Sequence, residues 1–346
     1  MIEFKGNINI MQVEKPMNNR NQALNLLKCF ACIGVVFIHV VFPGLLGKII
    51  KILSAFAVPC FYMIAGFYAF NCTENIIKRR LFKIMKIFLY SILLFFAFYF
   101  VVHIIEQDYN EWLIHLFTLK NTFKSIIFCT IDYAIPLWYL IAMIETYILW
   151  FFAVKYNKQE YLVKFIPLLF ILRFILTSYV ETKGLAWCLK INFITCSLNW
   201  FLLGYYIHKN KQKITTILNN KFLLLSILLG CTVALIPVIF NTCIKFSCIG
   251  LFFYSVALFI FAIKYEYNVI TNAMTYIGEK LSLNIYILHV LIAKLLHYIN
   301  VLQLHIQSVV LLFVKPLIVV VLTILIAYLI ELIKNRLISV KGLKNT

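Results

Sequence analysis

The sequence predicts an all-α integral membrane protein, a polytopic bundle of about ten transmembrane helices with both termini in the cytoplasm. Hydrophobic residues make up 63% of the 346 residues, charged residues only 13%, and the mean hydropathy is +0.94. Soluble domains use roughly 45 to 50% apolar residues. Apolar stretches of membrane-spanning length recur along the chain, and basic residues gather on one side of them.

Each apolar stretch is long enough to cross a hydrocarbon core about 30 Å thick. We expect one membrane domain over residues 22–333, preceded by a cytoplasmic segment, 1–21, and followed by a basic cytoplasmic tail, 334–346. The predicted spans lie near residues 22–42, 48–70, 83–105, 135–154, 161–180, 191–208, 222–240, 246–263, 281–300 and 308–333.

The distribution of Lys and Arg orients these spans. With the N-terminus inside, 21 of the 32 Lys and Arg residues fall on the inner side and 7 on the outer side. Cytoplasmic loops are the positively charged ones, so both termini are expected in the cytoplasm. The net charge of +19 is not gathered in a soluble basic domain, so we do not expect nucleic acid as a partner. We expect a multi-pass protein of the cytoplasmic membrane.

The first span carries two polar residues that a lipid-facing helix would avoid, Lys28 and His39. Eleven residues make just over three turns and about 16 Å of rise, so both side chains lie on one face of the helix. A charge at the bilayer centre costs roughly 2.5 to 3.5 kcal/mol. Lys28 could extend to the headgroups and His39 could sit at an interface, which would make both purely structural.

Further polar residues at membrane depth favour an internal site. They are Glu145, Arg173, His289, Lys294, His297 and Lys315. Such residues face a bundle interior or a water-filled cavity in most membrane proteins. The inner loop "NIIKRRLFKIMK" adds Arg79, Arg80 and Lys83, which suit an orientation signal, anionic lipids or the phosphates of a ligand.

Six stretches in order resemble the acyltransferase type 3 family, integral membrane proteins that O-acylate extracytoplasmic carbohydrates. The family has Arg or Lys, ten residues and His in its first span, and "KCFACIGVVFIH" is similar, with Lys28 and His39. "FAVPCFYMIAGFYAF" resembles the second span, with Ala65 where serine is usual, and "KRRLFKIMK" resembles the arginine-rich motif, with Lys83 replacing its second arginine. "PLWYLIAM", "NWFLLGYYI" and "LSLNIYILHVLI" resemble later segments.

The resemblance implies an O-acyltransferase that takes an acyl group, expected to be acetyl, from cytoplasmic acyl-CoA. The acceptor would be a hydroxyl of a cell-surface polysaccharide or a lipid-linked glycan. His39 would act as general base, oriented by Glu145 if the fourth span packs beside the first. The donor phosphates would contact Lys28, Arg79, Arg80 and Lys83. Acceptor or oxyanion contacts would come from Trp138, Arg173, Tyr286 and His289. Direct transfer, an acyl-histidine relay and delivery through a partner protein are three open routes.

The main alternative is a secondary transporter or flippase of a small polar or lipid-linked solute. Lys28, Glu145, Arg173 and His289 would suit an ion or substrate path, but the inverted repeats typical of transporters are not visible. A channel or structural protein would leave the basic cluster without a chemical purpose. His289 and His297 are two turns apart, too far for one tetrahedral metal without a third helix, so no metal or tightly bound cofactor is expected.

Overall fold

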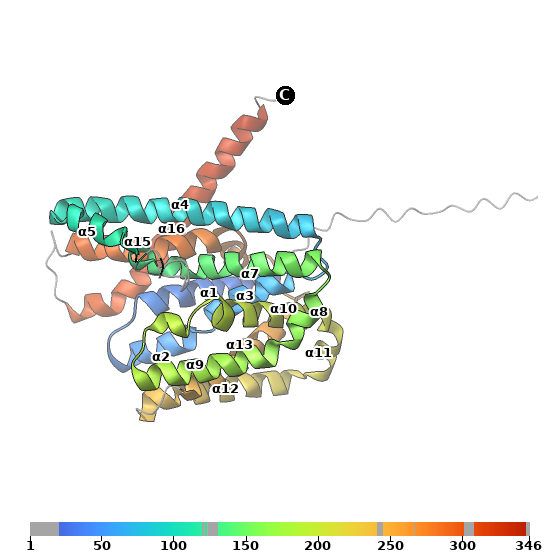
Figure 1. Ribbon diagram of the computed structural model, residues 1–346. Coiled ribbons are helices and arrows are strands. Elements are labelled where there is room, and N and C mark those ends of the chain that lie inside the picture. The colour runs from blue at the N-terminus through green and yellow to red at the C-terminus, as the bar shows by residue number, and fades with distance from the viewer. Residues whose placement is uncertain are drawn as a thin grey trace, which may run out of the picture.

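The protein is a bundle of helices that run side by side along one axis (Figure 1). The computed structural model describes residues 21–119, 121, 123, 131–240, 245–266, 268–300 and 308–343, so nearly all of the predicted N-terminal segment 1–21 lies outside the described residues. Every regular element within these ranges is helical. The helices are α1 (Gln22–His39), α2 (Gly44–Ser54), α3 (Ala57–Phe67), α4 (Glu74–Glu106), α5 (Tyr109–Leu116), η1 (Asp132–Leu137), α7 (Trp138–Lys155), α8 (Gln159–Lys164), α9 (Ile166–Lys183), η2 (Trp187–Leu189), η3 (Phe193–Leu198), α10 (Asn199–Lys209), α11 (Lys211–Ile217), α12 (Asn220–Phe240), α13 (Lys245–Lys264), α14 (Ala273–Tyr276), η4 (Ile277–Leu281), α15 (Ser282–Ile299) and α16 (Val309–Leu343).

Eight helical segments in the described part of the chain are long and apolar enough to cross a membrane. They confirm the prediction of an all-α, multi-pass architecture. The segments are Gln22–His39, Gly44–Phe67, Glu74–Glu106, Tyr133–Lys155, Asn220–Phe240, Ser247–Lys264, Ala273–Ile299 and Val309–Ile338.

The two other predicted spans, near 161–180 and 191–208, are weaker. Helix α9 has 18 residues but contains Arg173, Glu181 and Lys183. The second is divided between η3, a π-helix of 6 residues, and α10, of 11 residues. Both nevertheless lie inside the bundle, because α9 contacts α13 and α10 packs against α3. The total of about ten spans and the cytoplasmic placement of both termini stay predictions.

Helix α1 lies at the centre of the bundle, in contact with α2, α3, α13, α14, η4, α15 and α16. It begins at Asn21, whose side chain accepts a hydrogen bond from the backbone N–H of Leu24, a standard N-cap. Small residues let its neighbours approach closely. A Cβ atom on Gly278 of η4 would lie 1.8 Å from the carbonyl oxygen of Asn25, so only glycine fits this crossing.

Helix α4 begins earlier than the sequence suggested. The stretch "NIIKRRLFKIMK", expected as an inner loop, forms the first turns of α4 after Thr73, whose backbone is extended. Lys, Arg, Leu and Met are good helix formers, and Glu74 in the first turn interacts favourably with the helix dipole. Arg79, Arg80 and Lys83 are therefore held on a rigid helix rather than on a loop.

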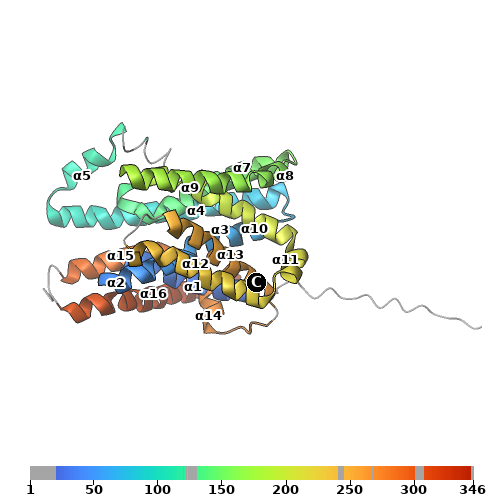
Figure 2. The same cartoon turned by 90° about the horizontal axis from the view of Figure 1, so that it is seen from below.

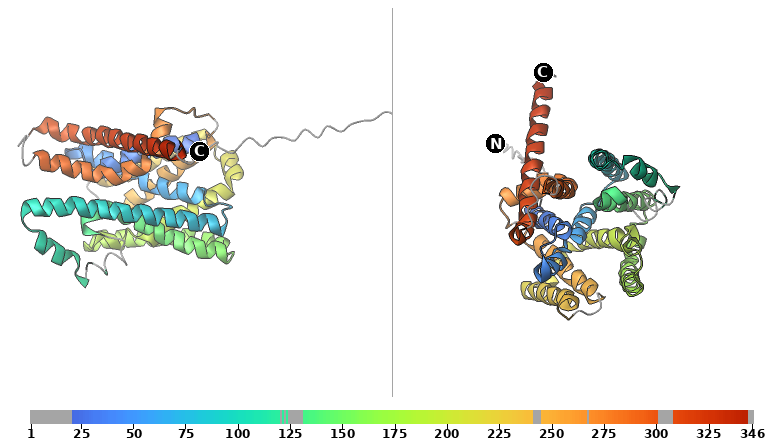
Figure 3. Two further views of the ribbon diagram at one scale, coloured as in Figure 1. Left: turned by 90° about the horizontal axis from the view of Figure 1, so that it is seen from above. Right: turned by 90° about the vertical axis from the view of Figure 1, so that its left-hand side faces the viewer.

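Helices α15 and α16 run together along one side of the bundle (Figure 2). Helix α16 continues to Leu343, so no helix end marks the predicted boundary between residues 333 and 334. Its C-terminal half projects away from the other helices (Figure 3). The predicted basic tail is thus a continuation of the last helix as far as residue 343.

Helices α3 and α10 cross where each helix places a glycine directly against the backbone of the other. A Cβ atom on Gly66 would lie 1.8 Å from the carbonyl oxygen of Phe201, and one on Gly204 would lie 2.0 Å from that of Met63.

We expect Gly66→Val to separate the two helices and to lower the free energy of unfolding by about 1 to 3 kcal/mol or more. The measurement is the melting temperature of the purified protein in detergent. The control is Ala97→Val on the exposed face of α4, and equal melting temperatures for both variants would contradict this packing.

Candidate functional site

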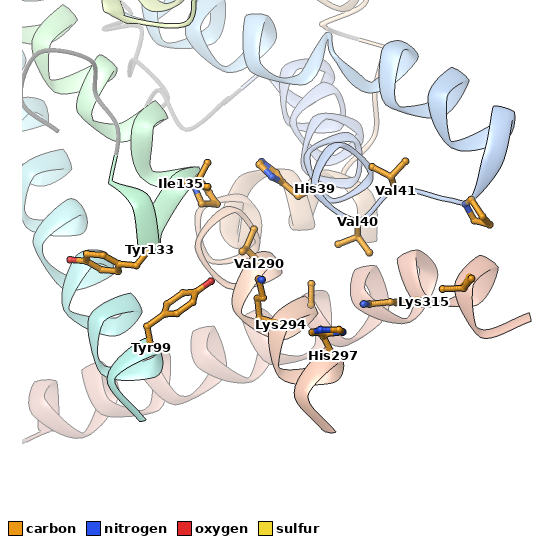
Figure 4. Close-up of a pocket in the computed structure, with 14 residues that line it drawn as sticks. His39, Val40, Val41, Tyr99, Tyr133, Ile135, Val290, Lys294, His297 and Lys315 are labelled. Carbon is orange, nitrogen blue, oxygen red and sulfur yellow. The ribbon is translucent and has the colours of Figure 1, made fainter. Parts of the chain in front are cut away.

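A cavity of about 720 Å³ opens at the end of α1, where His39 is the last helical residue. Ligand pockets typically measure about 300 to 1,000 Å³, so this one could hold a sugar-sized molecule. Its walls come from α1, α4, η1, α15 and α16 (Figure 4). The polar or aromatic residues that line it are His39, Tyr99, Tyr133, Lys294, His297 and Lys315.

His39 is exposed to this cavity, and its nearest aromatic neighbour is His289 of α15. The two ring centroids are 5.1 Å apart and the rings are inclined at 51°. The backbone N–H of Val40 still bonds to the carbonyl of Val36, so the helical hydrogen bonding holds the His39 backbone up to the cavity wall. The predicted first-span histidine and one of the predicted contact residues are thus brought together.

His289 is fully buried, and its two ring nitrogens differ in their surroundings. Nδ1 is 3.1 Å from the carbonyl oxygen of Ile285, which makes Nδ1 the donor of a hydrogen bond when the ring is neutral. Nε2 has no hydrogen-bond partner in the described structure. A buried acceptor without a partner costs free energy, so this ring is better suited to a functional role than to stabilising the bundle.

Tyr286 links the same helix to the cavity wall. Its hydroxyl donates a hydrogen bond to the carbonyl oxygen of Pro136 in η1, and Pro136 lines the cavity. The ring of Tyr286 lies 5.2 Å from that of Tyr139, which in turn lies 4.6 Å from that of Tyr62. Tyr286 therefore positions the wall of the cavity rather than facing the cavity itself.

Two lysines to which the sequence gave no individual role face the cavity. Lys294 comes from α15 and Lys315 from α16, and Figure 4 shows the Lys315 side chain directed toward Lys294 and His297. Neither lysine has a carboxylate within salt-bridge distance among the described residues. Their charge at membrane depth was a signal in the sequence, whereas nothing distinguished Tyr99 and Tyr133 from other aromatic residues.

The opposite end of α1 gathers the basic residues. The Lys28 ammonium lies 5.9 Å from the ring centroid of Tyr68, and Arg80 donates a 2.7 Å hydrogen bond to the carbonyl oxygen of the same tyrosine. Arg79 and Lys83 are exposed on α4 nearby. A second cavity, of about 430 Å³, is lined by Phe70, His208 and the basic residues at the start of α11. Lys28 and Arg80 are thus brought together by the turn after α3.

Three of the predicted site residues lie elsewhere. Glu145 lies within α7 and is not among the residues that line the cavity at His39. Arg173 donates a 2.9 Å hydrogen bond to the carbonyl oxygen of Thr195 in the π-helix η3. Trp138 packs against the main apolar core. None of the three lines the cavity at His39.

One cluster in the described part of the chain has the composition of a metal site. His103, Glu106 and Asp108 offer ligand atoms within 4.8 Å of one another at the end of α4. His103 Nδ1 is 2.7 Å from an oxygen of Asp108 and 3.5 Å from one of Glu106, and the imidazole stacks on Trp112 with centroids 4.8 Å apart. Pairing between its own members accounts for this cluster.

Comparison with known proteins gives one match. The model of a family described as an acyltransferase domain matches residues 21–332, nearly the whole chain. The match covers α1 with Lys28 and His39, the basic start of α4, and the helices that form both cavities. No match was found among curated proteins or among solved structures.

The hydrogen bond from Tyr286 to Pro136 predicts a measurable stability effect. Tyr286→Phe keeps the ring but removes the donor, so we expect the free energy of unfolding to fall by about 1 kcal/mol. The measurement is again thermal unfolding in detergent. Tyr90→Phe on the exposed side of α4 is the control, because Tyr90 is 71% exposed. If both variants had the same melting temperature as the parent, the hydrogen bond from Tyr286 to Pro136 would not hold η1 in place.

Proposed function

The chain belongs to the acyltransferase family whose model it matches, and from this premise we propose an acyl-CoA:glycan O-acyltransferase. The enzyme would move an acyl group, expected to be acetyl, from cytoplasmic acyl-CoA to a hydroxyl of a cell-surface glycan. The observation that carries the proposal is the arrangement along α1. Lys28 lies among basic residues at one end, and His39 faces a cavity about 16 Å away at the other.

We propose ten spans, with both termini on the cytoplasmic side of the cytoplasmic membrane. In this orientation Lys28, Arg80 and the start of α4 face the cytoplasm, where acyl-CoA is available. His39 and its cavity lie toward the outer surface, where the glycan is. In this orientation α5, which follows the third predicted span, is on the outer side, whereas α8 and α11, which follow the fourth and sixth spans, are on the inner side. Figure 1 supports this division, because α5 lies at one end of the bundle and α8 and α11 at the other.

The donor phosphates would be held by Lys28 and Arg80, with Arg79 and Lys83 adding charge from the neighbouring turns of α4. Charged donors form short, strong hydrogen bonds to phosphate oxygens, and Arg does so with two N–H groups at once. The remaining arm of the donor would extend along α1 toward His39. A co-substrate that enters from one side and reacts near the other needs such a fixed spacing.

At the outer end, neutral His39 would accept the proton of the acceptor hydroxyl as that oxygen attacks the thioester carbonyl. The C–O bond forms, the C–S bond breaks, and the thiolate of coenzyme A recovers the proton from the imidazolium. His289 would position the His39 ring, because it is the described ring that contacts it.

We expect His39→Ala to abolish most of the acyl transfer, by a factor of about 10² to 10⁴, because general base catalysis contributes that much. The measurement is the amount of base-labile acyl ester on cell-surface glycans. Four strains are compared at matched membrane expression: the parent, a deletion, and the deletion complemented with His39→Ala or with His115→Ala. His115 is exposed on α5 and serves as the control.

Ester in the parent and the His115→Ala strain alone would support the proposal. Equal ester in all four strains would contradict transfer to the glycans assayed, and solute uptake would then test the transporter alternative.

The donor site predicts a separate effect on binding. Lys28→Gln and Arg80→Gln should each raise the KM for acyl-CoA about tenfold while leaving kcat nearly unchanged, because a charged hydrogen bond contributes about 1.5 to 3 kcal/mol. Purified protein in nanodiscs, with acetyl-CoA consumption as the readout, provides the measurement. Lys86→Gln, an exposed charge on the same helix, should keep the parent KM. A changed kcat with an unchanged KM would contradict a role in donor binding.

A further inference from the structure

An apolar groove adjoins the cavity at His39. It measures about 540 Å³ and lies between the adjacent ends of α15 and α16. His297, Leu312 and Lys315 line both the groove and the cavity, so the two spaces meet at a charged boundary. Beyond this boundary most of the groove wall is aliphatic.

The groove also reaches the exposed outer surface of the bundle, which would face lipid in a membrane. Val309 is 67% exposed and Leu312 is 56% exposed, and both belong to the groove wall on α16. Apolar side chains with this exposure are stable on a membrane protein because they contact acyl chains. An aliphatic chain could therefore pass from the bilayer into the groove without crossing water.

The charges at the boundary define what kind of molecule fits. Lys294 and Lys315 approach the same space from two helices, and neither is neutralised by a carboxylate of the described residues. Two unpaired ammonium groups at membrane depth are costly, and a bound anion would offset that cost. Lysine binds phosphate as a point charge, so a phosphate group is the fitting anion.

We propose that the acceptor is a glycan carried on a lipid phosphate, with the aliphatic chain in the groove between α15 and α16 and the phosphate on Lys294 and Lys315. The assignment rests on the proposed function and names its acceptor class. Lys294 is five residues beyond His289, about 7.5 Å along α15. His39 and Lys294 line the same cavity, so a phosphate at Lys294 would place the sugar attached to it beside His39.

The test separates the chain from the phosphate. Full-length protein in phosphatidylcholine nanodiscs is titrated with farnesyl phosphate, with farnesol and with inorganic phosphate. We expect farnesyl phosphate to bind more tightly than either part. Lys294→Gln combined with Lys315→Gln should weaken farnesyl phosphate binding about tenfold or more and leave farnesol binding nearly unchanged. Lys48→Gln, an exposed lysine of α2, is the charge control.

The groove is tested with two neighbouring substitutions on α16. Val309→Trp should fill the groove and weaken both farnesyl phosphate and farnesol, whereas Val310→Trp, equally exposed but outside the groove wall, should not. Equal binding of farnesyl phosphate to the parent and the double Gln variant would overturn the proposal. So would displacement by phosphatidylglycerol at the same affinity, which would indicate a general anionic lipid site.

Acetyl-CoA binding is measured on the same nanodiscs. If the lysine-dependent lipid phosphate site is present but acetyl-CoA does not bind, the proposed function fails and the lipid phosphate site stands. If acetyl-CoA binds while farnesyl phosphate binds the parent and the double Gln variant with equal affinity, the enzyme proposal stands and the acceptor assignment fails.

Discussion

The fixed length of helix α1 is the constraint on which the rest of the structure depends. A helix satisfies its own backbone hydrogen bonds in lipid, so it can hold Lys28 and His39 about 16 Å apart without help from water. Its neighbours then fix where each end lies. Gly278 allows η4 to contact α1 beside Asn25 and Cys29, and α15 and α16 close the bundle around the His39 end. Two chemically different environments are thereby placed on one rigid element.

Polar groups inside this bundle divide into those that the protein satisfies itself and those that it leaves open. The guanidinium of Arg173 bonds to a carbonyl of the π-helix η3, and Tyr286 bonds to Pro136. Such pairs explain why the residues are tolerated among apolar side chains. His39, Lys294 and Lys315 instead face a cavity. Charge at membrane depth is thus only half of the signal for a site, and the presence or absence of an internal partner supplies the other half.

The sequence predicted the helical class and the placement of Lys28 and His39 on one face of α1, because both follow from local periodicity. It also singled out His289, but not its contact with His39, since that contact depends on how α15 packs against α1. Glu145 was assigned to His39 by analogy with hydrolases, but it lies within α7 and does not line the cavity at His39. The aromatic wall formed by Tyr99 and Tyr133 could not be predicted, because aromatic residues are common throughout the spans. Contacts between helices that are distant along the chain leave no periodic pattern in the sequence.

An acceptor held by its lipid would solve a physical problem that a free polysaccharide does not. A long soluble glycan presents many equivalent hydroxyls, and selecting one of them requires the loss of considerable conformational freedom. A lipid phosphate at Lys294 and Lys315, which line the cavity together with His39, would fix the depth of the attached sugar before the reaction begins. Positioning of this kind can supply a large part of the rate enhancement, because it makes the reacting groups effectively intramolecular. The groove between α15 and α16 would then position the acceptor, as α1 would position the donor.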